Sequence, residues 1–156
     1  MSENVNDASS VSIYEEIFPG DTNPFGTAFG GKILALMDRS AGLAAARFAH
    51  CHFVTVSLDS LDFRAPVQQG EIAEIRSKVV YTSKRTAGIK VEVFAVEKTK
   101  WEPRKCCQGV IFMVAMGEDG KPAPVPEFRP EGEGEKADWD YVASIHREML
   151  SRKHSE

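Results

Sequence analysis

One stretch between Gly30 and His50 limits the folds open to this chain more than any other part of it. Apolar residues recur there at intervals of three and four, which is the period of an α-helix with one buried side. The stripe consists of Ile33, Leu34, Met37, Ala41, Ala44, Ala45 and Phe48. A long helix of this kind needs a second layer of structure to cover its stripe.

Extended segments can supply that layer. A short strand is predicted near 11–17, before the helix, and four longer ones follow it. The four lie at 53–66, 72–82, around 89–93 and at 105–117, and the last is apolar enough to be buried on both faces. Short connections favour antiparallel neighbours, because parallel pairs need long crossovers. We therefore expect an α+β fold in which a curved antiparallel sheet of about five strands wraps one long central helix.

The chain of 156 residues has the size of one domain. We expect a flexible N-terminus at 1–10, the domain at 11–126, and a linker rich in proline and charge at 127–156 that ends in a short helix. The segment Glu131–Lys136 is expected to belong to the linker, and His146 on the helix to lie at the surface. The helix is predicted from the spacing of Trp139, Val142, Ile145 and Met149.

Charge and cysteine content exclude several classes of function. A net charge of −4 gives no basic field for nucleic acid or an anionic membrane, and no apolar run is long enough to span a bilayer. Three cysteines without regular spacing predict a reducing compartment, the cytoplasm. The run His50-Cys51-His52 cannot readily close around one ion, so no metal is expected. Cys106 and Cys107 are predicted to face opposite sides of their strand.

Two features of the predicted helix could support chemistry. Asp38 falls close to the apolar stripe, and helical geometry alone leaves open whether it is functional or a partly solvated residue at the edge. Gly30 and Gly31 begin the helix, where bare N–H groups at the positive end of the helix dipole suit a carbonyl that becomes an oxyanion. The same two glycines could instead serve only a structural purpose, since the absence of side chains lets the backbone enter a sterically crowded helix start.

Several blocks of sequence, in order, strongly resemble one enzyme family. They are Gly20-Asp21-Thr22-Asn23, Gly26, Phe29-Gly30-Gly31, Met37-Asp38, Ala41-Gly42, Val54 to Phe63, Pro66-Val67, Gly70 and Tyr81 to Thr86. Over about residues 12–126 the chain resembles the acyl-CoA thioester hydrolases of the hotdog fold. The resemblance implies that fold, and hydrolysis of acyl-CoA to a free acid and CoA without metal or organic cofactor.

The resemblance also assigns roles to residues. A loop Asn and a helix Asp act together in that family, and Asn23 and Asp38 occupy the matching positions. Asp38 would be a general base or a nucleophile, and Asn23 would orient water or donate to the thioester carbonyl beside Gly30 and Gly31. The family's nucleotide-side turn matches Ser83, Lys84, Arg85 and Thr86, with Arg64 as a weaker phosphate candidate. Without the resemblance, this turn would be taken for a solvated hairpin.

Helix geometry predicts a site shared between chains. Gly31 and Asp38 are seven residues apart, about 10 Å along a helix axis, which is too far for one Asp side chain to reach a carbonyl held at the helix start. Two antiparallel helices related by a two-fold axis would bring Asp38 of one protomer near Asn23 and Gly31 of the other. Leu36 and Leu43 are predicted to form a second apolar side of the helix. We expect a dimer and, by further association, a hexamer built as a trimer of dimers.

Two other functions compete with hydrolysis. An acyl-thioester dehydratase usually needs a His, and none occurs before His50. A non-catalytic acyl-CoA binder would keep Lys84 and Arg85 without needing Asp38. The chain also departs from many relatives at Pro24-Phe25, Thr27-Ala28 and Arg39, which leaves its preference for acyl chains open.

Overall fold

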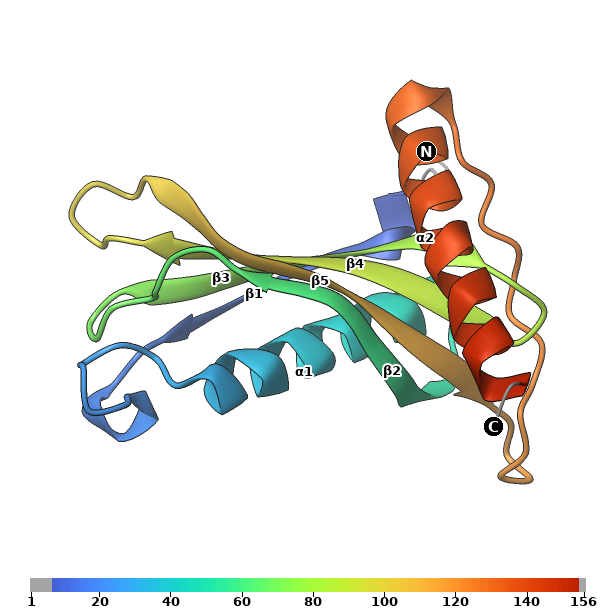
Figure 1. Cartoon of the computed structure of the whole chain (residues 1–156), viewed down its shortest axis with the longest axis horizontal. Coiled ribbons are helices and arrows are strands. Elements are labelled where there is room, and N and C mark those ends of the chain that lie inside the picture. Colours follow the sequence, from blue (N-terminus) through green and yellow to red (C-terminus); the bar gives the residue numbers. More distant parts are fainter. Residues whose placement is uncertain (1–6, 155–156) are drawn as a thin grey trace.

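The helix and the five strands expected from the sequence are all present in the computed structural model, which describes residues 7–154 (Figure 1). The α+β hotdog arrangement is confirmed. The predicted flexible N-terminus falls mainly on residues 1–6, outside the described residues, and the chain is already regular from Asp7. The elements are two 3-10 helices, Asp7–Ser9 and Pro19–Asp21, the strands β1 (Ser10–Glu16), β2 (His52–Phe63), β3 (Ile72–Thr82), β4 (Thr86–Val96) and β5 (Pro103–Met116), and the helices α1 (Gly30–Ala49) and α2 (Gly132–His154).

The strands form one antiparallel sheet in the order β1-β3-β4-β5-β2. Short connections led us to expect β2 beside β3, and this is wrong. β1 pairs with β3 from Ser10 to Glu16 and occupies the edge that β2 would need. The connection at 64–71 instead carries the chain across, so that β2 pairs with β5 and forms the opposite edge of the sheet.

α1 lies against one face of the curved sheet, and its apolar stripe forms the main core with the strands (Figure 1). Leu36 was expected on an uncovered side of the helix, but it is only 1% exposed, whereas Leu43 is 47% exposed. Leu36 and Leu43 are seven residues apart, almost two full turns, so they lie on nearly the same side of α1 and differ in their position along the helix. That side of the helix is therefore covered at Leu36 and open at Leu43.

α2 covers part of the other face of the sheet, where Val142, Ile145 and Met149 pack against β3 and β5. This explains why the middle of β5 is buried on both faces, as its apolar run predicted. The expected linker at Glu131–Lys136 is wrong, because α2 already begins at Gly132 and continues to His154. Glu133 and Glu135 suit the first turn of a helix, and Glu135 also pairs with Lys78 at 2.9 Å.

His146 is buried rather than at the surface, with 7% of its area exposed. It lies on the same face of α2 as Val142 and Met149, and its Nδ1 is 2.9 Å from the Tyr81 hydroxyl. The ring stacks on Phe112 at a centroid distance of 5.4 Å. Burial lowers the pKa of His146, which favours the neutral imidazole. Its role is therefore to hold α2 on the sheet.

Gly88 in β4 lets α2 approach this closely, and we expect Gly88→Ala to lower the free energy of unfolding by about 1–3 kcal/mol. A Cβ there would lie 2.6 Å from Cγ1 of Val142 and 3.2 Å from the Phe112 ring. Urea unfolding measures the change. Gly134→Ala is the matched control, because an added Cβ there meets nothing within 4 Å. The double variant Gly88→Ala/Val142→Ala should lose less free energy of unfolding than the two single variants together, because Val142→Ala removes the atom that the new Cβ would meet. Strictly additive losses would contradict this account.

Neither α1 nor α2 is apolar over a sufficient length to cross a lipid bilayer, and the described part of the chain contains no other helix that could do so.

Candidate functional site

The loop that leads from β1 to α1 is held together by the side chain of Asn23. Its Oδ1 accepts hydrogen bonds from the backbone N–H groups of Phe25 (3.0 Å) and Thr27 (3.2 Å), and its Nδ2 donates to Oγ1 of Thr27 (2.8 Å). The amide has two donor hydrogens, and Thr27 uses one of them. Asn23 therefore shapes the loop and retains one donor that no residue within 7–154 engages.

The start of α1 presents free backbone donors. Phe29 is the N-cap and provides no side-chain bond, and the first amide of the helix with a partner is that of Lys32, which donates to the Phe29 carbonyl at 3.0 Å. The N–H groups of Gly30 and Gly31 find no acceptor among the described residues. No acidic side chain lies in this first turn. The positive end of the helix dipole is thus open to a carbonyl oxygen, and both glycines are exposed.

Asp38 lies on the exposed side of α1 next to β2, at the edge of the apolar stripe. Its Oδ1 accepts a hydrogen bond of 2.5 Å from the Thr55 hydroxyl on β2, and its carboxylate is not directed into the core. Sequence reasoning missed Thr55. It stands within the Val54 to Phe63 block, but nothing in the alternation of that strand marks it. Only the packing of α1 beside β2 identifies it.

The predicted CoA-binding turn lies at the far end of the protomer from Gly30. The turn between β3 and β4 is closed by a bond from the Ser83 N–H to the Thr86 carbonyl (2.9 Å), and it leaves Lys84 and Arg85 exposed. Figure 1 shows this turn beyond the C-terminal end of α1. The eleven residues of β3 span about 35 Å. One protomer therefore does not bring the turn and the helix start together.

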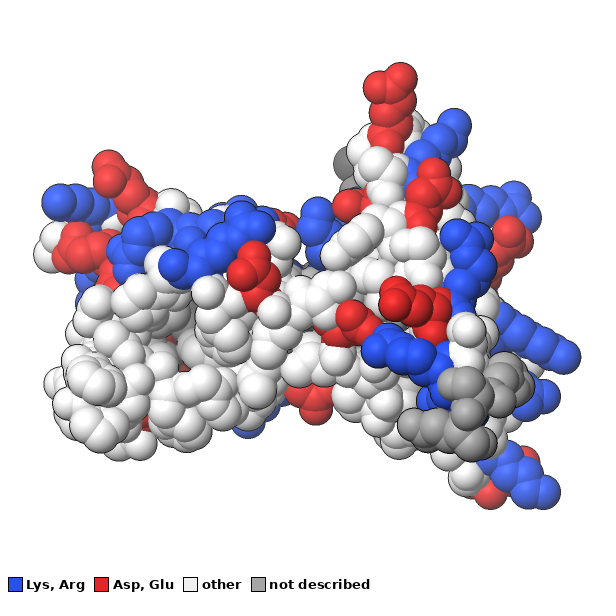
Figure 2. Space-filling model, in the orientation of Figure 1, with Lys and Arg blue, Asp and Glu red and all other residues white. Residues whose placement is uncertain are grey.

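β2 presents a free edge and an apolar surface. Its only partner in the sheet of the described chain is β5. Figure 2 shows few charged groups over the part of this face formed by α1 and β2. The exposed apolar residues are Leu43 on α1 and, along β2, Val54, Val56, Leu58, Leu61 and Phe63.

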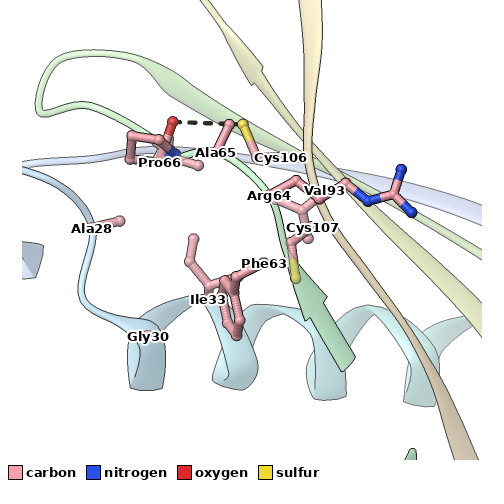
Figure 3. Close-up of a pocket in the computed structure, with 11 residues that line it drawn as sticks. Ala28, Gly30, Ile33, Phe63, Arg64, Ala65, Pro66, Val93, Cys106 and Cys107 are labelled. Atoms are coloured by element: carbon pink, nitrogen blue, oxygen red, sulfur yellow. Dashed lines mark hydrogen bonds between the residues drawn. The ribbon is translucent and has the colours of Figure 1, made fainter. Parts of the chain in front are cut away.

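A cavity of about 380 Å³ lies between the start of α1 and the ends of β2 and β5 (Figure 3). Arg64 is one of its lining residues, but its guanidinium points away from the cavity, and its Nε donates to Oδ2 of Asp62 at 2.6 Å. Arg64 therefore lies at the Gly30 end of the protomer, apart from Lys84 and Arg85. The other lining residues are Ala28, Gly30, Ile33, Phe63, Ala65, Pro66, Val67, Val93, Cys106 and Cys107.

Cys106 and Cys107 both line this cavity, but their sulfurs point in different directions: Sγ of Cys106 lies 3.6 Å from the Pro66 carbonyl, and Sγ of Cys107 lies 3.9 Å from Sδ of Met37 on α1 (Figure 3). Val93 pairs with Cys107 and the next residue of β4 pairs with Lys105, which makes Cys106 the extra residue of a β-bulge. Burial raises the pKa of Cys106, and it raises that of Cys107 to about 11. Both thiols are therefore protonated near neutral pH and act as apolar lining rather than as nucleophiles.

Within residues 7–154, no three His, Cys, Asp or Glu side chains gather in a way that could hold a metal ion.

Comparisons with known proteins agree with this architecture. The family model of the thioesterase superfamily matches residues 25–102. An uncharacterized acyl-CoA thioester hydrolase of Zymomonas mobilis is 35% identical over 125 residues, which cover 80% of this chain and 84% of that protein. A counterpart in Bacillus subtilis is 34% identical over 127 residues, 81% of this chain and 74% of that one.

Solved structures extend the match to three dimensions. A hexameric acyl-CoA thioesterase aligns with a TM-score of 0.88 and 32% identity, and covers 95% of both chains. An acyl-CoA hydrolase of Staphylococcus aureus, crystallised with butyryl-CoA, CoA and CoA disulfide, has a TM-score of 0.86 and 28% identity, with 96% of this chain and 92% of that one covered. Variants of the S. aureus enzyme with alanine in place of one asparagine, one aspartate and one threonine have also been solved.

Fold, sequence blocks and relatives lead to one assignment. The chain belongs to the thioesterase superfamily, as an acyl-CoA thioester hydrolase of the hotdog fold.

Proposed function

We propose that the chain hydrolyses acyl-CoA to a carboxylic acid and CoA at sites shared by two protomers, with Asp38 as general base or nucleophile. Asn23 and the N–H groups of Gly30 and Gly31 bind the thioester carbonyl and its developing negative charge. The observation that carries the proposal is the carboxylate of Asp38, which is exposed beside the sheet edge and held by Thr55. No metal or organic cofactor takes part in the proposal.

Thr55 acts in this proposal as a positioning residue. By donating to Oδ1 of Asp38 it fixes the orientation of the carboxylate and leaves Oδ2 free to take a proton from water or to attack the carbonyl. The replaced asparagine, aspartate and threonine of the S. aureus enzyme are 15 and 17 residues apart, in that order. Asn23, Asp38 and Thr55 are separated by the same intervals, which supports giving the three residues one shared function.

Distances within one protomer support a site shared between two chains. Asp38 is about 10 Å along the helix axis from Gly31, and the Lys84–Arg85 turn is at the other end of α1. A two-fold axis beside β2 would place Asp38 and the basic turn of one chain near the helix start of the other. It would also cover the free strand edge and the apolar surface of β2, which native proteins rarely leave exposed. We propose such a dimer and, since a relative is hexameric, a trimer of dimers.

Lys84 and Arg85 are proposed to hold the CoA phosphates, together with Ser83 and Thr86 in the same turn. Changing both cations to Ala is expected to raise KM for acyl-CoA by roughly ten-fold at low salt, because the phosphates lie far from the reacting carbon. Turnover of a short acyl thioester without the nucleotide should stay nearly constant. Steady-state kinetics on both substrates measures this, with Lys121→Ala as the exposed-cation control. Equal effects on both substrates would make the turn structural.

The overall proposal is tested by release of free CoA thiol from acyl-CoA, using purified protein to which no metal has been added. Failure to release thiol from acyl-CoA of any chain length would refute it.

A further inference from the structure

We infer that the cavity between α1 and the sheet, whose described lining comes from one protomer, is an acyl pocket, and that it selects unsubstituted acyl chains of medium length. The inference rests on the proposed hydrolysis at Gly30. It adds the substrate class, which the sequence leaves open.

The position of the cavity connects it to the reacting group. Gly30, whose N–H is proposed to bind the thioester carbonyl, is itself a lining residue, and Ala28 lies on the same rim (Figure 3). The carbon chain of an acyl group starts at that carbonyl. A carbonyl held at the helix start therefore has this cavity as the space next to it, between α1 and the end of β2.

The lining excludes polar acyl groups. Ile33, Val67 and Val93 are at most 4% exposed and offer only hydrocarbon. The Pro66 carbonyl is already used by the Cys106 thiol (3.6 Å) and by Arg104 (3.2 Å). Both thiols are protonated, and the guanidinium of Arg64 points outward. A carboxylate or hydroxyl on the acyl chain would thus lose its water without gaining a partner, which costs several kcal/mol in general.

The size of the cavity sets the chain length. A volume of about 380 Å³ corresponds to on the order of ten groups of the size of a water molecule, about 30 Å³ each, and a methylene is of similar size. The small side chains of Ala28 and Ala65 leave this space open. Val93 and Cys107, which pair across β4 and β5 and are almost fully buried, also line it. An acyl chain of about eight to twelve carbons fits such a space, whereas an acetyl group leaves most of it empty.

Ala65→Leu tests the inference because it adds three carbons inside the cavity. The measurement is kcat/KM for acetyl-, octanoyl- and palmitoyl-CoA, and for an octanoyl-CoA analogue with a terminal carboxylate. In wild type we expect octanoyl-CoA to be the best substrate and the carboxylate analogue to be poor. In the variant, the ratio of kcat/KM for octanoyl-CoA to that for acetyl-CoA should fall by at least about ten-fold. Ala137→Leu, the same change on the exposed surface of α2, is the control and should preserve the ratio.

A second variant and a binding measurement keep the test decisive if Ala65→Leu folds poorly. Ala28→Leu fills the cavity from the loop and should lower the same ratio. Calorimetry on the Asp38→Asn protein should show tighter binding of octanoyl-CoA than of acetyl-CoA, and Ala28→Leu should remove the difference. A wild type that prefers acetyl-CoA, or filled variants that keep the wild-type ratio, would overturn the acyl pocket while leaving hydrolysis intact. If the proposed hydrolysis itself is wrong, the result is different, because no acyl-CoA then releases thiol.

Discussion

Replacing Asp38 with Asn is expected to lower kcat by about 10²–10⁴-fold while the protein remains folded. Asn has nearly the shape of Asp and can still accept the hydrogen bond from Thr55, but it can neither take a proton from water nor attack a carbonyl. Release of CoA thiol under saturating acyl-CoA measures the loss. Asp140→Asn removes a carboxylate from the exposed surface of α2 and should leave turnover unchanged.

Thr55 allows a graded version of the same experiment. Thr55→Val keeps the shape of the side chain and removes the hydroxyl that donates to Asp38 at 2.5 Å, so turnover should fall by less than in Asp38→Asn. Thr55→Ser retains the hydroxyl and should recover most of the activity. Full turnover in a folded Asp38→Asn protein would remove Asp38 from the mechanism, and equal losses in the two Thr55 variants would make Thr55 structural.

Mixing two inactive variants should restore activity if the site is shared. Asn23→Ala and Asp38→Ala proteins are unfolded together and refolded, so that some dimers contain one chain of each kind. Each mixed dimer would then hold one site with both residues intact and one site with neither. We expect up to about half of the wild-type activity per mixed dimer, and about a quarter overall if equal amounts assort at random. The assay is again release of CoA thiol.

Two controls make the mixing experiment decisive. Each variant unfolded and refolded alone should remain nearly inactive, and native mass spectrometry of chains with different tags should confirm that subunits exchanged. If mixed dimers form and no activity returns, Asp38 must act within its own chain. The distances between Asp38, Gly31 and Asn23 would then have to change substantially in the folded protomer.

Local patterns in the sequence were sufficient for most of the secondary structure. The spacing of Ile33, Met37 and Ala44 predicted α1 almost to its last residue, and alternation predicted Ile72–Thr82 as the structure has it. These patterns work because side-chain direction repeats every 3.6 residues in a helix and every two in a strand. The continuous apolar run of β5 also correctly indicated burial on both faces.

Errors occurred where distant segments meet. The pairing of β2 with β5 depends on β1 occupying the edge beside β3, which no local pattern contains. The bulge at Cys106 interrupts the simple alternation of β5, and no local pattern marks it. Burial of His146 depends on which face of α2 packs on the sheet, and Gly88 leaves room there for Val142, which lies on the same face as His146.

By itself, the sequence determined the central helix, the strands, the family and the candidate residues Asn23, Gly30, Gly31 and Asp38. The helix and strands follow from short-range periodicity. The family and the candidate residues follow from sequence blocks that occur in the same order as in the acyl-CoA thioester hydrolases. Only the tertiary structure decided that Thr55 holds Asp38, that the Lys84–Arg85 turn is remote from Gly30, and that a cavity adjoins the helix start. Each of these depends on the curvature and strand order of the sheet, which bring together residues far apart in sequence, and such long-range contacts leave no period in the chain.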